Sequence, residues 1–233
     1  MSGSDGNTLR GIDLLKDLPA EELEKIEKAC RWKKYDKDEQ IIDRQSDSRD
    51  IFFVVSGRVR VVIYSLSGRE VTLDDNEPGS FFGELAAIDG YPRSASVMAL
   101  RETLVASLPP QSFADMLAKH PGIAMKVMRR LAWIIRSSTE RIMDLSTLGA
   151  NNRVHAELIR LASVDMDTDS NFAVISPIPV HSDIASRVST TRETVARVLN
   201  DLARQGIVQR QKSSLMIADM ERLQAMVEDV RGE

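Results

Sequence analysis

The stretch FGELAAIDGYPRSASV, residues 82–97, places one carboxylate and one guanidinium among small and apolar residues. Glu84 stands between Gly83 and Leu85, and Arg93 follows nine positions later, after a Gly-Tyr-Pro turn. A charge that is buried needs a partner, because its transfer out of water is costly. The two side chains therefore either pair with each other or both bind a ligand that is not part of the chain.

Short runs rich in Val, Ile, Phe and Thr lie on both sides of this stretch, about ten residues apart. Evenly spaced strands with turn glycines are typical of an all-β barrel or sandwich. The runs are QIIDR, IFFVV, RVRVVIY, EVTLD, SASVMAL and TLVASL, and the turn glycines are Gly57, Gly68, Gly79 and Gly90. Short helices, opened by prolines, are predicted before and after the strands, at residues 19–30 and 109–119.

A long helix is predicted after Pro121, with apolar residues at alternating steps of four and three. One narrow apolar stripe of this kind needs a partner, so residues 121–149 are expected to form a homodimer; a helix lying on its own barrel is the alternative. Ser138 interrupts the stripe, and it either fixes the register of a coiled coil or faces a ligand near the dimer axis. The heptad positions are Ala124, Met128, Leu131, Ile135, Ser138, Ile142 and Leu145.

After a boundary near Gly149 and a helix at 153–163, residues 181–214 predict two helices, a tight turn and a β-hairpin. This order describes a winged helix-turn-helix. Thr191 is a good N-cap for the second helix, and Gly206 ends it. The buried face of that helix is expected to hold Val195, Val198, Leu199 and Leu202.

That buried face leaves Arg192, Glu193 and Arg197 on the outward side of the second helix. Arginine can donate two bonds to guanine and glutamate can accept one from cytosine, and recognition helices read bases from their N-terminal part. Residues 181–214 carry six basic and three acidic residues, whereas the whole chain has a net charge of −4. This local excess agrees with contact to nucleic acid, and a solvated helix face is the alternative.

Composition and missing motifs narrow the class of protein. The chain is 42% hydrophobic and 28% charged, has no membrane-length apolar run and starts with no signal-peptide pattern, so a cytoplasmic protein is expected. Its single cysteine, Cys30, excludes an internal disulfide or a Cys-ligated metal cluster. The acidic run 165–172 lacks the Gly and Glu of a calcium loop, and no catalytic motif is present. No metal, no cofactor and no enzymatic activity are expected.

Two motifs together resemble the Crp–Fnr superfamily of transcription regulators, over nearly the whole chain. GELAAIDGYPRSA (83–95) is similar to the phosphate-binding cassette of cyclic-nucleotide domains, and TRETVARVL (191–199) is similar to the recognition helix of the superfamily. The resemblance implies an α+β protein. Its expected parts are a cyclic-nucleotide-binding β-roll (1–120), a dimerisation helix (121–149) and a winged helix-turn-helix DNA-binding domain (150–233).

The resemblance also implies roles for the residues of the opening stretch. Arg93 would clamp the cyclic phosphate, Glu84 would accept a bond from the ribose 2′-hydroxyl, and Ser94 would add a hydroxyl at the phosphate. Cyclic AMP is the expected effector, and cyclic GMP is the second candidate. The purine would meet one of the two residues Ser138 and Thr139 from each subunit. The full expected nucleotide set is Gly83, Glu84, Leu85, Arg93, Ser94, Ala95, Ser138 and Thr139.

The expected DNA set is Thr191, Arg192, Glu193 and Arg197, reading a palindromic TGTGA-like site, with RNA polymerase as a further partner. An iron–sulfur relative would need several cysteines, and a haem relative would need a histidine inside the β-roll. One departure is Ser189, which stands where the turn commonly has Gly. Alternatives that stay open are a ligand-independent regulator or one tuned to another effector, a nucleotide-directed enzyme, and a regulatory subunit of a kinase or channel.

Overall fold

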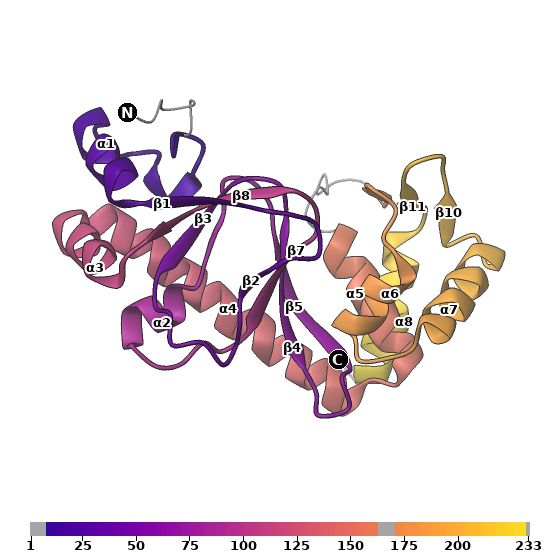
Figure 1. Cartoon of the computed structure of the whole chain (residues 1–233). Coiled ribbons are helices and arrows are strands. Elements are labelled where there is room, and N and C mark those ends of the chain that lie inside the picture. Colours follow the sequence, from indigo (N-terminus) through magenta and orange to yellow (C-terminus); the bar gives the residue numbers. More distant parts are fainter. Residues whose placement is uncertain (1–7, 163–170, 232–233) are drawn as a thin grey trace. The chain divides into compact units, whose positions relative to one another are not determined.

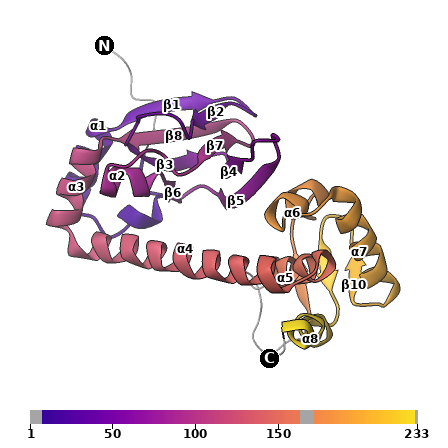
Figure 2. The same ribbon diagram turned by 90° about the horizontal axis from the view of Figure 1, so that it is seen from below.

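The computed structural model describes residues 8–162 and 171–231 (Figure 1). The chain divides into two compact units, Met1–Trp133 and Ile134–Glu233. The division falls inside one long helix, α4 (Pro121–Thr147), which Figure 2 shows from the side. Each unit is described by itself. No helix among the described residues is both long enough and apolar enough to span a membrane.

The first unit is built on two antiparallel four-stranded sheets, with strand orders β1-β8-β3-β6 and β2-β7-β4-β5. The spacing of the apolar runs predicted a barrel or sandwich, and the two sheets form the jelly roll that the resemblance implied. The prediction omitted two strands, β1 and β6, and found the other six. The strands are β1 (Arg31–Tyr35), β2 (Gln40–Ile42), β3 (Ile51–Ser56), β4 (Val59–Tyr64), β5 (Glu70–Asn76), β6 (Phe81–Phe82), β7 (Ser96–Ala99) and β8 (Thr103–Leu108).

Helices close one end of this roll. Phe53 of β3 and Phe113 of α3 are fully buried in a core that also holds Ile123 and Val127 from the first turns of α4. Burial of such large side chains is worth about 1.5–3 kcal/mol each, so this core fixes the start of α4 on the roll. The other helical elements of the unit are a 3-10 turn (Asp13–Leu15), α1 (Ala20–Ala29), α2 (Glu84–Asp89) and α3 (Pro110–Lys119).

Helix α4 buries one face and leaves its heptad stripe largely open. Of the heptad positions, Leu131 packs against the core of the roll. Met128 is 52% exposed, Ile135 65%, Ile142 63% and Leu145 50%. Such large apolar side chains in a row along a helix are costly in water. Within the first unit, the roll therefore covers Leu131 and leaves Met128 more than half exposed.

The second unit is a small α/β domain around its own core, in which Leu158, Ile184, Val195 and Leu202 are almost fully buried. The predicted helix-turn-helix and hairpin are present. The third strand β9 and the C-terminal helix α8 were not predicted, and residues 165–170 of the predicted acidic loop lie outside the described residues. The elements are α5 (Ala150–Ala162), β9 (Ala173–Ile175), α6 (His181–Arg187), α7 (Arg192–Arg204), β10 (Val208–Arg210), β11 (Leu215–Ile217) and α8 (Met220–Arg231), with sheet order β10-β11-β9.

Candidate nucleotide and DNA sites

Gly83 shapes the turn between β6 and α2. Its φ is 82°, a left-handed conformation that glycine adopts without steric cost. A Cβ at this position would lie 2.7 Å from a terminal nitrogen of Arg93 and 3.1 Å from the carbonyl oxygen of Asp50. Glycine is therefore required here both by the backbone conformation and by the close approach of Arg93. The turn brings the start of α2 beside that guanidinium.

Arg93 is only 4% exposed and points inward from the end of the cassette. It donates to the carbonyl oxygens of Gly83 (3.0 Å) and Asp50 (2.8 Å). Nε and Nη2 each also donate to the hydroxyl of Ser48 at 3.2 Å, and the group lies over the Phe52 ring. Burial lowers the pKa of Arg93, but a guanidinium stays charged in proteins. The buried cation is thus held by neutral oxygens.

Glu84, the first residue of α2, is 6% exposed, and the described residues contain no ion pair between it and Arg93. Burial raises the pKa of Glu84. A hydrogen bond from its own backbone N–H and the charges of Arg130 and Arg93 lower that pKa more weakly, and Asp74 raises it. Arg130 comes from α4 and pairs with Asp74 at 2.5 Å. The opening alternative, in which the two charges satisfy each other, is therefore not what the fold shows. In the described part of the chain, no lysine or arginine forms an ion pair with this carboxylate.

The structure gathers Gly83, Glu84 and Arg93, and it adds three groups that sequence reasoning missed: Ser48, the Asp50 carbonyl and Arg130. The remaining cassette residues differ in exposure. Ser94 and Leu85 are exposed, whereas Ala95 is 7% exposed. Ser138 and Thr139 are exposed on the part of α4 that belongs to the second unit, and the hydroxyl of Thr139 donates to the Ile135 carbonyl at 2.9 Å.

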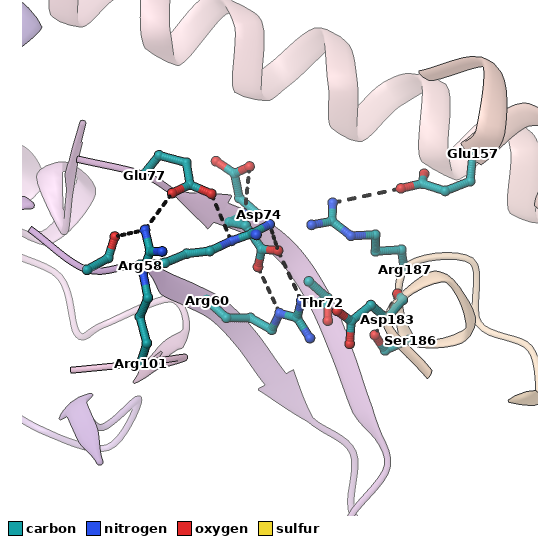
Figure 3. Close-up of polar contacts among 12 residues, drawn as sticks. Arg58, Arg60, Thr72, Asp74, Glu77, Arg101, Glu157, Asp183, Ser186 and Arg187 are labelled. Atoms are coloured by element: carbon teal, nitrogen blue, oxygen red, sulfur yellow. Dashed lines mark hydrogen bonds and ion pairs between the residues drawn. The ribbon is translucent and has the colours of Figure 1, made fainter. Parts of the chain in front are cut away.

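A second cluster of charges on β4 and β5 is satisfied internally. Arg60 is 7% exposed and donates to Asp75 from Nε at 2.8 Å and from Nη2 at 3.0 Å. Arg58 pairs with Glu77 at 3.0 Å, and Arg101 donates to the Gly57 carbonyl at 2.8 Å (Figure 3). Two parallel bonds between guanidinium and carboxylate are a strong arrangement. The cluster therefore joins β4 to β5 within the second sheet.

In the second unit the recognition helix is capped and oriented as predicted. The Thr191 side chain accepts a bond from the Thr194 amide at 3.2 Å, which is N-cap geometry. Arg192, Glu193 and Arg197 are exposed on α7, opposite its buried apolar face. An arginine, a glutamate and a second arginine in the first turns of an exposed helix can donate to and accept from base edges.

The turn before α7 contains the residue that departs from the superfamily pattern. Ser189 has a φ of 52°, so the position does need a left-handed backbone, and serine adopts it at a steric cost. The expected helix-turn-helix geometry nonetheless forms. Neighbouring contacts therefore hold this turn in place.

Comparisons with known proteins match each of the two units to a known domain family. Residues 32–120 match the family model for the cyclic nucleotide-binding domain, and residues 152–226 match the model for the Crp-like helix-turn-helix domain. A CRP-like cAMP-activated global transcriptional regulator from Mycobacterium tuberculosis is 28% identical over 74% of this chain and 77% of its own length. The cyclic AMP receptor protein of Thermus thermophilus is also 28% identical, over 86% of this chain and 89% of its own length.

Among solved structures, a CooA mutant from Carboxydothermus hydrogenoformans superposes with a TM-score of 0.80 at 23% identity, covering 96% of this chain and 97% of the other. This likeness supports the fold alone. The nucleotide-binding domain precedes the helix-turn-helix domain in this chain. The two named relatives are a transcriptional regulator and a cyclic AMP receptor protein. The chain therefore belongs to the Crp–Fnr superfamily, as a Crp-like cyclic-nucleotide-binding transcription regulator.

Proposed function

We propose that the protein is a homodimeric regulator that binds cyclic AMP in the β-roll and a palindromic DNA site through two copies of α7. The observation that carries the proposal is the grouping of Gly83, Glu84 and Arg93: one buried cation, one buried acceptor and a glycine that opens the space between them. A ribose cyclic phosphate offers one anion and one hydroxyl donor, which are the complementary groups. Two relatives of this chain are named for cyclic AMP.

Arg93 donates charge-assisted bonds to the phosphate, with the hydroxyl of Ser94 beside it. The carboxylate of Glu84 accepts a bond from the ribose 2′-hydroxyl. Burial raises the pKa of Glu84 although its own backbone N–H donates to the carboxylate, and a ribose hydroxyl would supply a further donor. Leu85 and Ala95 flank these groups in the cassette and complete the set of contacts.

The purine is assigned to Ser138 and Thr139 of α4, one from each subunit. The hydroxyl hydrogen of Thr139 is used in a bond to the Ile135 carbonyl, so its oxygen remains available as an acceptor. An acceptor suits the 6-amino group of adenine. Ser94 can accept a bond from the 2-amino group of a guanine in the syn orientation, and for this reason cyclic GMP is the second candidate.

The dimer is assigned to residues 121–149, most of which form α4 (Pro121–Thr147). Its heptad positions Met128, Ile135 and Ile142 are each more than half exposed in the single chain, and a second copy of the same helix is the partner that a heptad stripe fits. In such a dimer the two recognition helices reach successive turns of the DNA major groove, about 34 Å apart. Thr191, Arg192, Glu193 and Arg197 then read an inverted pair of TGTGA-like half-sites, and bound regulator contacts RNA polymerase.

The deciding experiment is a gel shift of a TGTGA-like inverted repeat in the presence of cyclic AMP, of cyclic GMP or of no nucleotide. Calorimetric titration of the protein with each nucleotide, without DNA, accompanies it. Arg93→Ala should lower the affinity for cyclic AMP by at least about tenfold, because a charge-assisted hydrogen bond is worth about 1.5–3 kcal/mol or more. Arg101→Ala is the matched control, since this arginine of the same unit lies outside the cassette and has a side chain 59% exposed.

The outcomes separate the alternatives. DNA binding that is equally tight with and without nucleotide would favour a ligand-independent regulator. Nucleotide binding without any DNA binding would favour a regulatory subunit. Unchanged cyclic AMP affinity in Arg93→Ala would overturn the ligand assignment.

A further inference from the structure

The side chain of Arg153, at the start of α5, contacts two chain reversals at once. Its Nε donates to the Val188 carbonyl at 2.9 Å and its Nη2 to the Ser189 carbonyl at 3.3 Å. Its Nη1 donates to the Leu148 carbonyl, at the junction between α4 and α5, at 2.9 Å. One half-buried guanidinium therefore joins the turn of the helix-turn-helix to the end of the long helix.

The carbonyl groups that Arg153 contacts are ones that a helix end leaves without partners. Val188 is the C-cap of α6, and the last carbonyls of a helix have no intrahelical donor. Ser189 follows with a φ of 52°, a conformation that is unfavourable for a residue with a Cβ. The planar guanidinium carries several donors in a fixed fork, so it can serve these adjacent carbonyls together, which an ammonium on a flexible stem does poorly.

A chain of ion pairs runs parallel to this clamp within the same unit. Arg187 of α6 lies 3.8 Å from Glu157 of α5, which is 1% exposed, and Figure 3 shows the two side chains directed toward each other. Arg160 of α5 pairs with Glu157 and reaches Asp144 of α4 at 2.7 Å. The first helix of the helix-turn-helix is thus joined to α5, and α5 to the end of α4, by contacts other than the peptide chain.

We infer that Arg153 is a positioning residue for DNA recognition: it fixes the direction of the recognition helix α7 relative to the end of the dimer helix. The residue lies on α5, outside the outward face of α7, so its role is separate from base reading. In a dimer, the direction of α7 in each copy determines the separation of half-sites that both helices can reach together. Arg153 therefore sets the tolerance of the protein for half-site spacing. This inference rests on the proposed function.

The test compares half-site spacing in wild type, Arg153→Ala and Arg153→Lys. A preferred site is first selected from random duplex DNA by the wild-type protein with cyclic AMP, and its spacer is then lengthened or shortened by one and two base pairs. Arg153→Ala should bind the preferred site about tenfold more weakly, and its loss of affinity on changing the spacer should be several-fold smaller than that of wild type. Arg153→Lys should restore little, because it keeps the charge but lacks the fork.

Arg222→Ala is the matched control. Arg222 is an exposed arginine of the same unit that donates to the carbonyl of Gln205, the C-cap of α7, at 3.4 Å. It touches the far end of the recognition helix and leaves the turn before it untouched. Its spacing profile should equal that of wild type. An unchanged spacing profile in Arg153→Ala would overturn the inference, whereas a wild-type protein without sequence-specific binding would overturn the proposed function instead.

Amide hydrogen exchange tests the clamp without DNA. The Val188 amide donates to Ile184 at 3.1 Å and the Thr190 amide to Ala185 at 3.0 Å. Both should exchange at least several-fold faster in Arg153→Ala and Arg153→Lys, while the Ile207 amide, bonded to Leu202 at 3.0 Å beyond α7, should keep its rate. Equal acceleration of all three amides would show general loosening of the unit and would contradict a specific clamp.

Discussion

Replacing Glu84 by Gln is expected to change stability and affinity in opposite directions. The substitution keeps the size of the side chain and removes its charge. Glu84 is 6% exposed and burial raises its pKa above the ordinary value, so folding disfavours the charged form. Glu84→Gln should therefore raise the free energy of unfolding at neutral pH.

The pH dependence follows from the direction of that shift. Because the pKa of Glu84 is raised on folding, the folded state binds more protons than the unfolded state between the two pKa values. The wild type therefore loses stability as pH rises through the folded-state pKa. The stability advantage of Glu84→Gln should be full above that pKa and should disappear below the unfolded-state value, near 4.5.

Nucleotide affinity should fall in the same variant. A hydrogen bond from the ribose hydroxyl to a carboxylate is worth about 1.5–3 kcal/mol, and a neutral amide recovers only part of it. Complete loss of this bond would weaken cyclic AMP binding by about 10- to 150-fold, and Glu84→Gln should lose part of that amount. On the proposed function, the carboxylate whose burial costs stability is also the group that binds the ribose hydroxyl.

Two measurements check this pair of effects: calorimetric titration with cyclic AMP, and urea unfolding at about pH 5 and about pH 8. Glu77→Gln is the control, because the Glu77 side chain is 54% exposed and pairs with Arg58 outside the cassette. It should leave cyclic AMP affinity unchanged. A Glu84→Gln protein that binds cyclic AMP as tightly as wild type would refute the ribose assignment, whatever its stability.

Three further predictions concern purine choice, base reading and assembly. Ser94→Ala should weaken cyclic GMP more than cyclic AMP, by about 2- to 12-fold for one neutral hydrogen bond; titrations giving equal losses would mean that Ser94 serves only the shared phosphate. Arg197→Ala should cost about 1–3 kcal/mol on the specific site and relax preference at one guanine, and a footprint showing the same loss on random DNA would contradict base readout. Ile135→Glu should yield monomers in sedimentation. Met143 is also more than half exposed on α4 but lies off the heptad stripe, so Met143→Glu should leave dimers; dimers in both would place the interface elsewhere.

Features with a local sequence signal could be predicted, and those set by distant contacts could not. The six predicted strands have apolar residues with turn glycines between them, whereas β1, with sequence RWKKY, carries three basic residues and reads as polar. Its place is set by pairing with β8, more than 60 residues away. Strand β6 is only two residues long, which is too short for any periodicity to be visible.

The same division holds for the site. Gly83, Glu84 and Arg93 lie within one short stretch whose charge and spacing are visible in the sequence. Ser48 and Arg130 contact or influence these residues only after folding, from 45 residues before Arg93 and from the α4 helix. Nothing in their own neighbourhoods marks them, since an isolated serine and an arginine on a helix are ordinary surface residues.

The hydrogen bonds that Arg93 donates within the roll influence which anions can bind to its guanidinium. An inorganic phosphate or sulfate ion that reaches the guanidinium must displace bonds already donated to Ser48, Gly83 and Asp50. A small symmetrical anion offers little in return, whereas a ligand that also reaches Glu84 offers more. On the proposed function, we therefore expect inorganic phosphate and sulfate to bind weakly, so that occupancy of the site follows the concentration of the nucleotide rather than the ionic composition around it.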